Sequence, residues 1–415
     1  MHLILRCLPV CDMARASQVC AAWRADALHL QARSDTIHCF ETNSEQRLAN
    51  LLESPWKTFF TQLIIVFDVF HSINILRGLC AFIRTNPNLK RVSIHNVYFL
   101  TRDEFSKCLD AIAIHASVTA FELIKVLRFT PYAASLAKFI ATNTSVTHLT
   151  VRNTQWHGII LPRYVGINDR DMATLADGIA KNRHLTHLDF GFNEGVGEQS
   201  VGALVSAMSK HNSVTSLCLE STSFRFLGTC DIARYIRFNP NMTTLNLASN
   251  VFTLSGMTAI FRAMQGHSNL THANLRGMPM DNKKIALVFV DAIKSTHLVA
   301  LHLGQTHMHS EVMNEFVHVL SANKTITAID FSYAVLIKSN IQALTACIAT
   351  NTTLKTMDLS YCNLYIEDIY ALIRAVSMNK NDISIRMIDC APDVPHEKAA
   401  LVAATALLHP GAFVF

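Results

Sequence analysis

Histidine is the residue type with the widest chemical capability in this sequence. The chain of 415 residues has 20 histidines, and an imidazole can bind a metal ion or transfer a proton near neutral pH. His148, His187 and Asp189 occupy related positions of a repeated pattern. Two imidazoles and a carboxylate could ligate zinc if they converge, since zinc needs three or four ligands. A polar sheet surface explains the same residues, and we expect neither a metal nor a cofactor.

Catalytic motifs are absent from the sequence. It contains no G-x-x-x-x-G-K-S/T, G-x-S-x-G, H-E-x-x-H or C-x-x-C motif, so a phosphate-binding loop or a hydrolase nucleophile has no support. Gly195 and Gly197 fit a turn between a strand and a helix. We therefore expect a protein that binds partners and is not an enzyme.

One short pattern recurs ten times and determines where these residues lie. Clear copies are residues 143–151, 182–190, 239–247 and 351–359. We call the first apolar residue of each copy its anchor. The anchors are Leu89, Val118, Val146, Leu185, Val214, Met242, Leu270, Leu298, Ile326 and Leu354. The differences between successive anchor numbers are 29, 28, 39, 29, 28, 28, 28, 28 and 28. A fixed period of this length predicts a solenoid of stacked units.

Each unit is predicted to be a strand followed by a helix. Apolar residues alternate after the anchor, as at Leu245 and Leu247, and then take the helical spacing of residues 257, 260, 261 and 264. The residue three before the anchor is Asn at 86, 143, 182, 239, 323 and 351, His at 115, 211 and 267, and Ser at 295. We expect Asn to end each helix in the left-handed conformation, with His as a structural substitute.

These residues resemble the ribonuclease-inhibitor class of leucine-rich repeats, whose form is L-x-x-L-x-L-x-x-N. Met242, Leu245, Leu247 and Asn250 fit this form, and the resemblance covers roughly residues 34–390. It implies an α/β fold: a curved solenoid, or horseshoe, with a parallel sheet on the concave side and helices on the convex side. Residues 34–70 read as degenerate first repeats, with strands at 37–39 and 63–65 and a helix at 45–53. About twelve strands are expected in all, and a last one is possible at 383–388.

Side chains two, four and six positions after each anchor should face the concave side. We predict partner binding there, with basic groups toward the N-terminal half and carboxylates toward the C-terminal end. The predicted contact residues are Arg91, His148, Arg152, His187, Asp189, His272, His302, Asp330 and Asp358.

The single irregular spacing marks an insertion at about residues 154–167. Insertions in repeats often form binding loops, and Trp156, Arg163 and Tyr164 are of the types enriched at interface hot spots. Alternatively, the loop folds back on its own scaffold and buries residues 159–161.

Residues 1–30 carry a second resemblance. Val19, Cys20, Trp23 and Arg24 match the V-C-x-x-W-R core of an F-box, the helical motif that docks on the Skp-type adaptor of a cullin ubiquitin ligase. The resemblance covers the later two-thirds of the motif, and the usual opening Leu-Pro and acidic residue have no counterpart here. It implies adaptor binding by Leu3, Leu5, Leu8, Val19 and Trp23. Alternatively, this segment only caps the first repeat.

The predicted organisation is therefore a helical cap at 1–30, repeats at 31–390 and a helical cap at 391–415. The net charge of +5, with 16% charged residues and no basic run, gives no support for nucleic-acid binding. No apolar run reaches the roughly 18–20 residues that span a bilayer. Eleven cysteines without regular pairing favour a reducing compartment, cytoplasmic or nuclear.

Three functions remain open from the sequence. The first is a protein-recognition scaffold that serves as substrate receptor of a cullin-type ubiquitin ligase. The second is a leucine-rich repeat regulatory or effector protein without a ligase link. The third is a GTPase activator similar to the Ran GTPase-activating protein, which uses this repeat class. We rank this activator last, because that family carries a long acidic tail and the present sequence ends Gly411-Ala-Phe-Val-Phe415.

Overall fold

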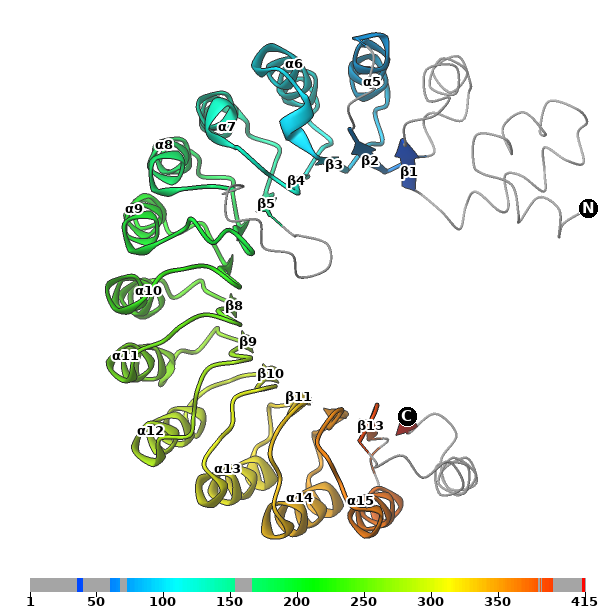
Figure 1. Ribbon diagram of the computed structural model, residues 1–415, viewed down its shortest axis with the longest axis vertical. Coiled ribbons are helices and arrows are strands. Elements are labelled where there is room, and N and C mark those ends of the chain that lie inside the picture. Colours follow the sequence, from blue (N-terminus) through cyan, green and yellow to red (C-terminus); the bar gives the residue numbers. More distant parts are fainter. Residues whose placement is uncertain are drawn as a thin grey trace, which may run out of the picture. The chain divides into compact units, whose positions relative to one another are not determined.

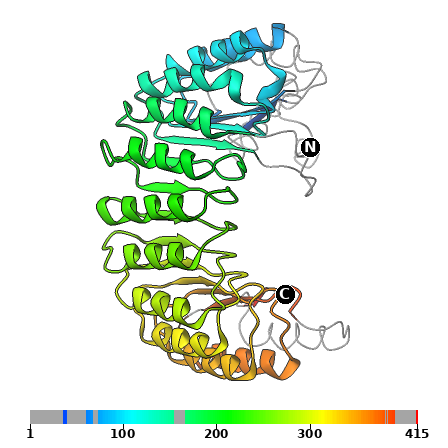
Figure 2. The same cartoon turned by 60° about the vertical axis from the view of Figure 1, so that its left-hand side comes forward.

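The structure is a computed structural model that describes residues 36–39, 60–67, 73–153, 166–379, 381, 383–390 and 413–414. The chain divides into two compact units, residues 1–214 and 215–415. In each unit the strands form a parallel sheet in sequence order, and the helices lie along the other side (Figures 1 and 2). In the second unit, the helices lie outside an arc that the strands line from within (Figure 1).

The described part of the chain contains fourteen strands. In the first unit they are β1 (Thr36–Cys39), β2 (Gln62–Val66), β3 (Arg91–His95), β4 (Ala120–Ile124), β5 (His148–Arg152) and β6 (His187–Asp189). In the second unit they are β7 (Ser216–Cys218), β8 (Thr244–Asn246), β9 (His272–Asn274), β10 (Ala300–His302), β11 (Ala328–Asp330), β12 (Thr356–Asp358), β13 (Ser384–Arg386) and β14 (Phe413–Val414). The twelve expected strands are present, as is the possible last one at β13, whereas β14 was not predicted.

Helices connect successive strands on one side of the sheet. In the first unit they are α5 (Ile73–Thr85), α6 (Arg102–Ala113), α7 (Thr130–Thr142), α8 (Asp169–Ile179) and α9 (Glu198–Met208), with a short 3-10 helix at Val97–Phe99. In the second unit they are α10 (Phe226–Phe238), α11 (Leu254–Met264), α12 (Lys283–Ile293), α13 (Ser310–Ala322), α14 (Lys338–Thr350) and α15 (Ile366–Met378). Within the described residues, no helix has the length and apolar composition required to cross a membrane.

The repeat period sets the register of the sheet. Pairing advances by one repeat at each step in the second unit, as from Ser216 to Thr244 and from Thr356 to Ser384. In the first unit His148 pairs with His187, so the longer spacing there is absorbed outside the ladder. The predicted insertion therefore leaves the strand pairing intact.

The core lies between the sheet and the helices. All ten anchors are at most 2% exposed, as expected for positions that begin each buried strand face. In the second unit, aromatic rings continue across repeats: Phe261 lies 5.1 Å from Phe289, which lies 5.6 Å from Phe316, measured between ring centroids. Buried aromatic side chains make the largest apolar contributions to a core. This continuous packing explains why a single repeat cannot be stable without its neighbouring repeats.

The asparagine before each anchor ends the helix in a way that the sequence analysis described wrongly. Asn143 and Asn351 have φ angles of −79° and −69°, so neither is left-handed. Instead, the side-chain oxygen of Asn351 accepts hydrogen bonds from the N–H groups of Thr353 and Leu354 at 2.8 and 2.7 Å. Its amide group donates to the carbonyl oxygen of Leu320 in the preceding repeat at 2.8 Å. The residue thus closes the turn and joins two repeats.

Histidine reproduces this arrangement at residues 211 and 267, in line with its predicted structural role. His211 Nε2 lies 3.0 Å from the carbonyl oxygen of Ile179, and His211 Nδ1 accepts from the N–H of Ser213. His267 pairs in the same way with the carbonyl oxygen of Asn239 and the N–H of Leu270. A ring with one donor and one acceptor nitrogen can therefore replace the carboxamide. At the third position, His115 Nδ1 lies 3.2 Å from Ser117 Oγ, and its buried Nε2 has no hydrogen-bond partner among the described residues.

The left-handed conformation occurs elsewhere in each repeat, at the end of the strand. Seven residues after the anchor, nine of the ten anchored repeats have a φ angle between 50° and 73°. In the second unit the N–H of this residue donates to a carbonyl of the next repeat, as from Tyr361 to Ile388 at 2.9 Å. The bend therefore turns the chain out of the strand while it extends the hydrogen-bonded ladder. A regular left-handed position of this kind was not predicted.

Several predicted segments lie outside the described residues. These are the helical caps at 1–30 and 391–412, the helix at 45–53, and most of the inserted loop, at 154–165.

Candidate functional site

The positions two, four and six residues after each anchor form three columns across the strands, which we call the first, second and third column. These columns are only partly open to solvent. Two residues after the anchor, Arg91, His148 and His272 are exposed. Six residues after the anchor, Ser332 and Ser360 are buried, with 4% and 3% of their surface exposed. The chain bends at the seventh residue after the anchor, and this bend places the sixth residue beneath the neighbouring side chains. The first two columns therefore carry the accessible groups, and part of the third supports them.

In the first unit, two histidines of the first column lie against each other. The rings of His148 and His187 stack with 3.8 Å between their centroids and 15° between their planes. Each Nδ1 lies 2.8 Å from the hydroxyl oxygen of the preceding threonine, Thr147 or Thr186. These hydroxyls also lie close to backbone carbonyls that can accept their protons. A hydroxyl that donates to the carbonyl leaves Nδ1 as the ring donor and Nε2 as an acceptor at the surface.

Both imidazoles are held toward the neutral form. Burial lowers the pKa of His148, and the nearby charge of Arg91 lowers it further. Burial also lowers the pKa of His187, with an additional effect from His148 itself. Within the described residues, no group of three or more His, Cys, Asp or Glu side chains is arranged to hold a metal ion.

Beside this pair, the structure joins two other predicted contact residues. The Nε of Arg152 donates to Asp189 Oδ2 at 2.7 Å. The guanidinium of Arg152 also lies 5.3 Å from the ring centroid of Phe192, at the left-handed position of its repeat. In the same way, Arg91 Nε lies 3.6 Å from Glu122 Oε1. These contacts hold long side chains in defined orientations.

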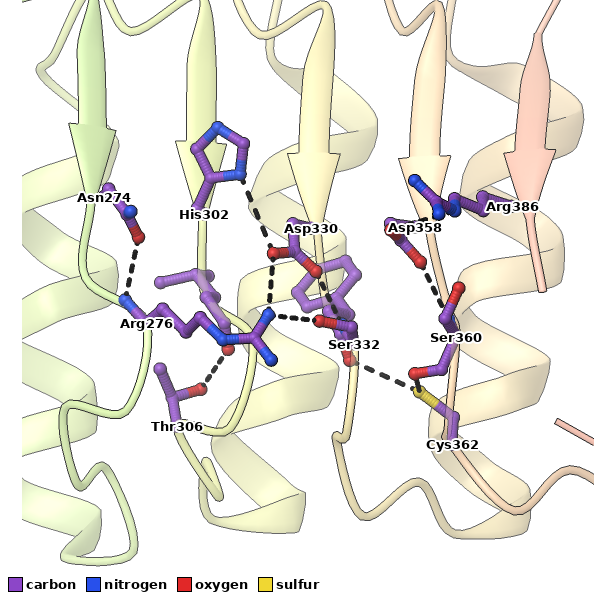
Figure 3. A network of polar contacts seen from close by, with 12 residues as sticks. Asn274, Arg276, His302, Thr306, Asp330, Ser332, Asp358, Ser360, Cys362 and Arg386 are labelled. Atoms are coloured by element: carbon purple, nitrogen blue, oxygen red, sulfur yellow. Dashed lines mark hydrogen bonds and ion pairs between the residues drawn. The ribbon is translucent and has the colours of Figure 1, made fainter. Parts of the chain in front are cut away.

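In the second unit, Arg276 crosses a whole repeat to reach its partners (Figure 3). Its Nη1 donates to Ser332 Oγ at 2.8 Å and lies 3.6 Å from Asp330 Oδ2. The repeat between them has Gly304 at the sixth position. A Cβ at residue 304 would lie 2.8 Å from Arg276 Nη1 and 2.6 Å from Ser332 Oγ. The absence of a side chain at Gly304 is therefore what gives the arginine room.

Asp330 is the centre of this network. Its Oδ2 lies 3.7 Å from His302 Nδ1, and its Oδ1 accepts from the N–H of Ser332 at 2.7 Å. Burial alone would raise the pKa of Asp330, but His302, Ser332 and the charge of Arg276 together lower it below the ordinary value. The carboxylate therefore stays ionised and holds the side chains of Arg276 and His302 in place.

Asp358 repeats part of this arrangement one strand further on. Its Oδ1 accepts from the N–H of Ser360 at 2.8 Å, and its Oδ2 lies 4.0 Å from Arg386 Nε (Figure 3). His272 remains exposed, with its Nδ1 2.9 Å from the Thr271 hydroxyl.

The charged residues of the predicted gradation are paired in the structure, and the gradation itself stays a prediction. Arg152 and Arg91 each have a carboxylate partner, and Asp330 and Asp358 each have a guanidinium partner.

The described cysteines differ in the direction of their pKa shifts. A hydrogen bond with the Cys108 thiol lowers the pKa of the Cys80 thiol, whereas burial raises that of several others. Cys362 is buried among apolar groups, and this burial raises the pKa of its thiol to about 12. Burial also raises the pKa of the Cys347 thiol. Seven cysteine side chains are described, and all are free thiols.

The remaining predicted contact residues lie outside the described part of the chain. These are Trp156, Arg163 and Tyr164 of the inserted loop, and Leu3, Leu5, Leu8, Val19 and Trp23 of the N-terminal segment. The predicted contact residues did not include Arg276, Gly304, Tyr333 or Tyr361. The recurrence of tyrosine at one position of consecutive repeats, 333 and 361, was the available indication.

Comparison with known proteins finds a similarity to one sequence family. Residues 181–205 and 238–261 match the sequence profile of the family described as Leucine Rich repeat. Together with the strand–helix units, these matches support a leucine-rich repeat protein. Its ribonuclease-inhibitor class remains a prediction from the repeat length. The comparison with curated proteins finds no match to the chain.

Two solved structures illustrate the extent of the likeness. One chain of the complex of Rad7 and Elc1 in yeast is 12% identical, with 86% of this chain and 85% of that chain covered and a TM-score of 0.47. The leucine-rich repeat-containing protein LegL7 from Legionella pneumophila is 13% identical, with 90% and 98% covered and a TM-score of 0.40.

Proposed function

We propose that the chain is a protein-recognition scaffold that binds partners on the strand-lined faces of its units. The observation that carries this proposal is the set of accessible polar side chains held in fixed orientations by ion pairs and hydrogen bonds, as at Arg152–Asp189 and Arg276–Asp330. Side chains that are ordered before binding lose less conformational entropy when a partner docks. The lack of catalytic motifs in the sequence favours binding over catalysis.

The proposed contact residues are those of the first two columns. In the first unit they are Arg91, His148, His187 and Asp189 with the neighbouring Arg152, and in the second unit His272, His302, Asp330 and Asp358. We include Trp156, Arg163 and Tyr164 of the inserted loop on their residue types alone.

The test is co-purification with partners from cells, followed by identification of the bound proteins. Exposed column residues are replaced in each unit separately, Arg91→Ala with His148→Ala, or His272→Ala with His302→Ala. We expect at least one pair to lose a partner that wild type retains, while the melting temperature changes little. Equal capture by wild type and both variants would contradict binding through the columns. The inserted loop is tested in the same way with Trp156, Arg163 and Tyr164 replaced together.

A more specific proposal is a substrate receptor of a cullin-type ubiquitin ligase. It is supported by the F-box-like residues Val19, Cys20, Trp23 and Arg24 alone. Purified full-length chain should bind a purified Skp-type adaptor, and Trp23→Ala should weaken this binding while circular dichroism stays native. No adaptor binding by the wild type at about micromolar concentration would favour the alternative, a leucine-rich repeat regulatory or effector protein without a ligase link.

A further inference from the structure

Two consecutive loops of the second unit expose large apolar side chains at the edge where the strands end. The loop between β11 and α14 carries Tyr333, Val335 and Ile337, which are 38%, 68% and 48% exposed. The next loop, between β12 and α15, carries Tyr361 and Tyr365, which are 42% and 72% exposed. We call these five residues the tyrosine strip. Single exposed apolar residues are ordinary, whereas neighbouring ones gathered in one place mark interaction surfaces.

The two central tyrosines occupy strained backbone positions. Tyr333 and Tyr361 have φ angles of 59° and 61°, in the left-handed region that bulky side chains rarely adopt. Other repeats place residues that suit this region better, such as Gly277 and Asp389. The left-handed bend belongs to the repeat, since it recurs at this position in nine of the ten anchored repeats and Phe192 also occupies it. The bend brings both tyrosine side chains to the surface, where they are partly exposed.

The two rings form a parallel stack that already holds a guanidinium at one end. Tyr333 and Tyr361 stack with 4.4 Å between centroids and 13° between planes. The guanidinium of Arg276 lies 5.3 Å from the centroid of the Tyr333 ring. The stack therefore accepts an arginine side chain at its Tyr333 end, where the ring and Asp330 both attract the positive charge.

The Tyr361 end of the stack offers the same two groups, an aromatic ring and a carboxylate. Among the described residues, no arginine lies there as Arg276 lies beside Tyr333. The N–H of Tyr361 bonds to the carbonyl of Ile388, so the turn of residues 388–389 lies beside Tyr361. Asp389 occupies the next left-handed position of the column, and its side chain is exposed. Residues 361 and 389 thus occupy neighbouring positions of adjacent repeats, about one strand spacing apart along the backbone.

The strand ends and loops next to Tyr361 in the sequence carry more acidic than basic residues. Residues 358–370 and 384–390 carry four carboxylates and one cation, listed as Asp358, Glu367, Asp368, Asp389 and Arg386. Arg386 lies near Asp358, at 4.0 Å. An incoming cation would therefore be attracted to this end of the strip, and an incoming carboxylate repelled.

We propose that the tyrosine strip binds an extended protein segment by an arginine side chain that stacks on Tyr361 opposite Tyr333. Asp389 neutralises the guanidinium, and apolar residues that flank the arginine cover Val335, Ile337 and Tyr365. Arginine is favoured over lysine because a planar guanidinium stacks on a ring and binds a carboxylate at the same time. This inference rests on the proposed scaffold function and adds the chemistry of the partner.

The probe is a fluorescent peptide with one arginine flanked on each side by two leucines and capped by glycine. Three matched peptides replace the arginine by lysine, by the neutral analogue citrulline, or by glutamate. Binding to the full-length chain is measured by fluorescence anisotropy. We expect saturable binding of the arginine peptide, weakened about tenfold by citrulline and abolished by glutamate. Lysine should give an intermediate affinity.

Substitutions then locate the site. Tyr361→Asn should weaken binding about tenfold, and it should fold normally because asparagine suits the left-handed position. Asp389→Asn should weaken binding of the arginine peptide and leave that of the citrulline peptide unchanged. Tyr370→Ala is the control, because Tyr370 lies in α15 of the same repeat with 38% exposure. It should bind as wild type does.

The proposal is overturned if wild type does not bind the arginine peptide at about 1 mM, or binds the citrulline peptide equally well. It is also overturned if folded Tyr361→Asn binds like wild type. Each of these results leaves the scaffold function standing, provided that wild type still captures cellular partners and a column variant loses them. If both column variants instead capture the same partners as wild type, the scaffold proposal itself is contradicted.

Discussion

The imidazole rings of His148 and His187 stack face to face, with 3.8 Å between their centroids. They come from paired positions of adjacent strands, although a whole repeat and its insertion separate them in the chain. Two protonated rings at this distance would repel each other, and burial further disfavours the charged form. The pair is therefore a neutral surface feature at ordinary pH.

The pair should make stability depend on mildly acidic pH. Both pKa values are lowered from the ordinary 6.5, so the unfolded chain binds protons more readily than the folded one. Their contribution is present above about pH 6.5 and is lost as the pH falls through the folded-state pKa values. We expect the melting temperature of wild type to fall more between about pH 7 and pH 5 than that of the variant with both His148→Gln and His187→Gln.

The same relationship is testable by nuclear magnetic resonance titration. His148→Gln removes a positive charge that would otherwise develop beside His187, so the pKa of His187 should rise toward its ordinary value. An unchanged His187 pKa in a folded His148→Gln variant would show that the two rings do not interact in solution.

The asparagine that ends α14 should be a large single contributor to stability. Asn351→Ala leaves the N–H groups of Thr353 and Leu354 and the carbonyl of Leu320 without their partner. Asn351 is fully buried, so we expect a loss of about 3 kcal/mol in the free energy of unfolding. Urea denaturation measures it.

Asn351→His is the matched variant for this position. His211 and His267 make the equivalent bonds in other repeats, so histidine should recover a large part of the stability that alanine loses. Histidine and alanine variants of equal stability would mean that the side-chain bonds contribute little.

Gly304 should be intolerant of even the smallest side chain. In Gly304→Ala the new methyl group would lie 2.8 Å from Arg276 Nη1 and 2.6 Å from Ser332 Oγ. We expect a destabilisation of about 1–3 kcal/mol from overpacking and displacement of the arginine. Gly197→Ala is the steric control, because its nearest contact would be 3.6 Å away. Gly197 is the N-cap of α9, so its substitution should cost only the loss of a favourable cap residue, about 1 kcal/mol.

A double-mutant cycle separates the two causes of this loss. If Gly304→Ala acts by displacing Arg276, it should cost less when Arg276→Ala has already removed that side chain. Fully additive losses would show that the clash with Ser332 alone is responsible.

Truncation tests how the second unit ends. Ending the chain at residue 380 removes β13, whose Ile383 and Ile385 are buried, and exposes the side of β12 that pairs with it. We expect aggregation, observed by size-exclusion chromatography. A chain ending at residue 390 keeps β13 and tests the proposed 391–415 cap separately. A monomeric 1–380 fragment would contradict the need for any further strand.

The sequence alone determined the repeating architecture. Anchors such as Met242 and Leu354 are apolar at a fixed period, and that period is long enough only for a short strand and a helix. Strand positions and buried faces follow from the alternation around residues 245 and 247, because burial selects apolar residues locally along the chain. That local pattern is why the twelve strands and their parallel order could be predicted.

Tertiary structure decided which polar groups meet. Arg276 and Ser332 are 56 residues apart, and their contact depends on the lack of a side chain at Gly304 in the repeat between them. The amide of Asn351 bonds to the repeat before it, which a local analysis of helix ends could not reveal. The tyrosine stack likewise requires two strained residues to fall in register. Such contacts depend on how the repeats stack, because residues far apart in the chain become neighbours only when the strands pair.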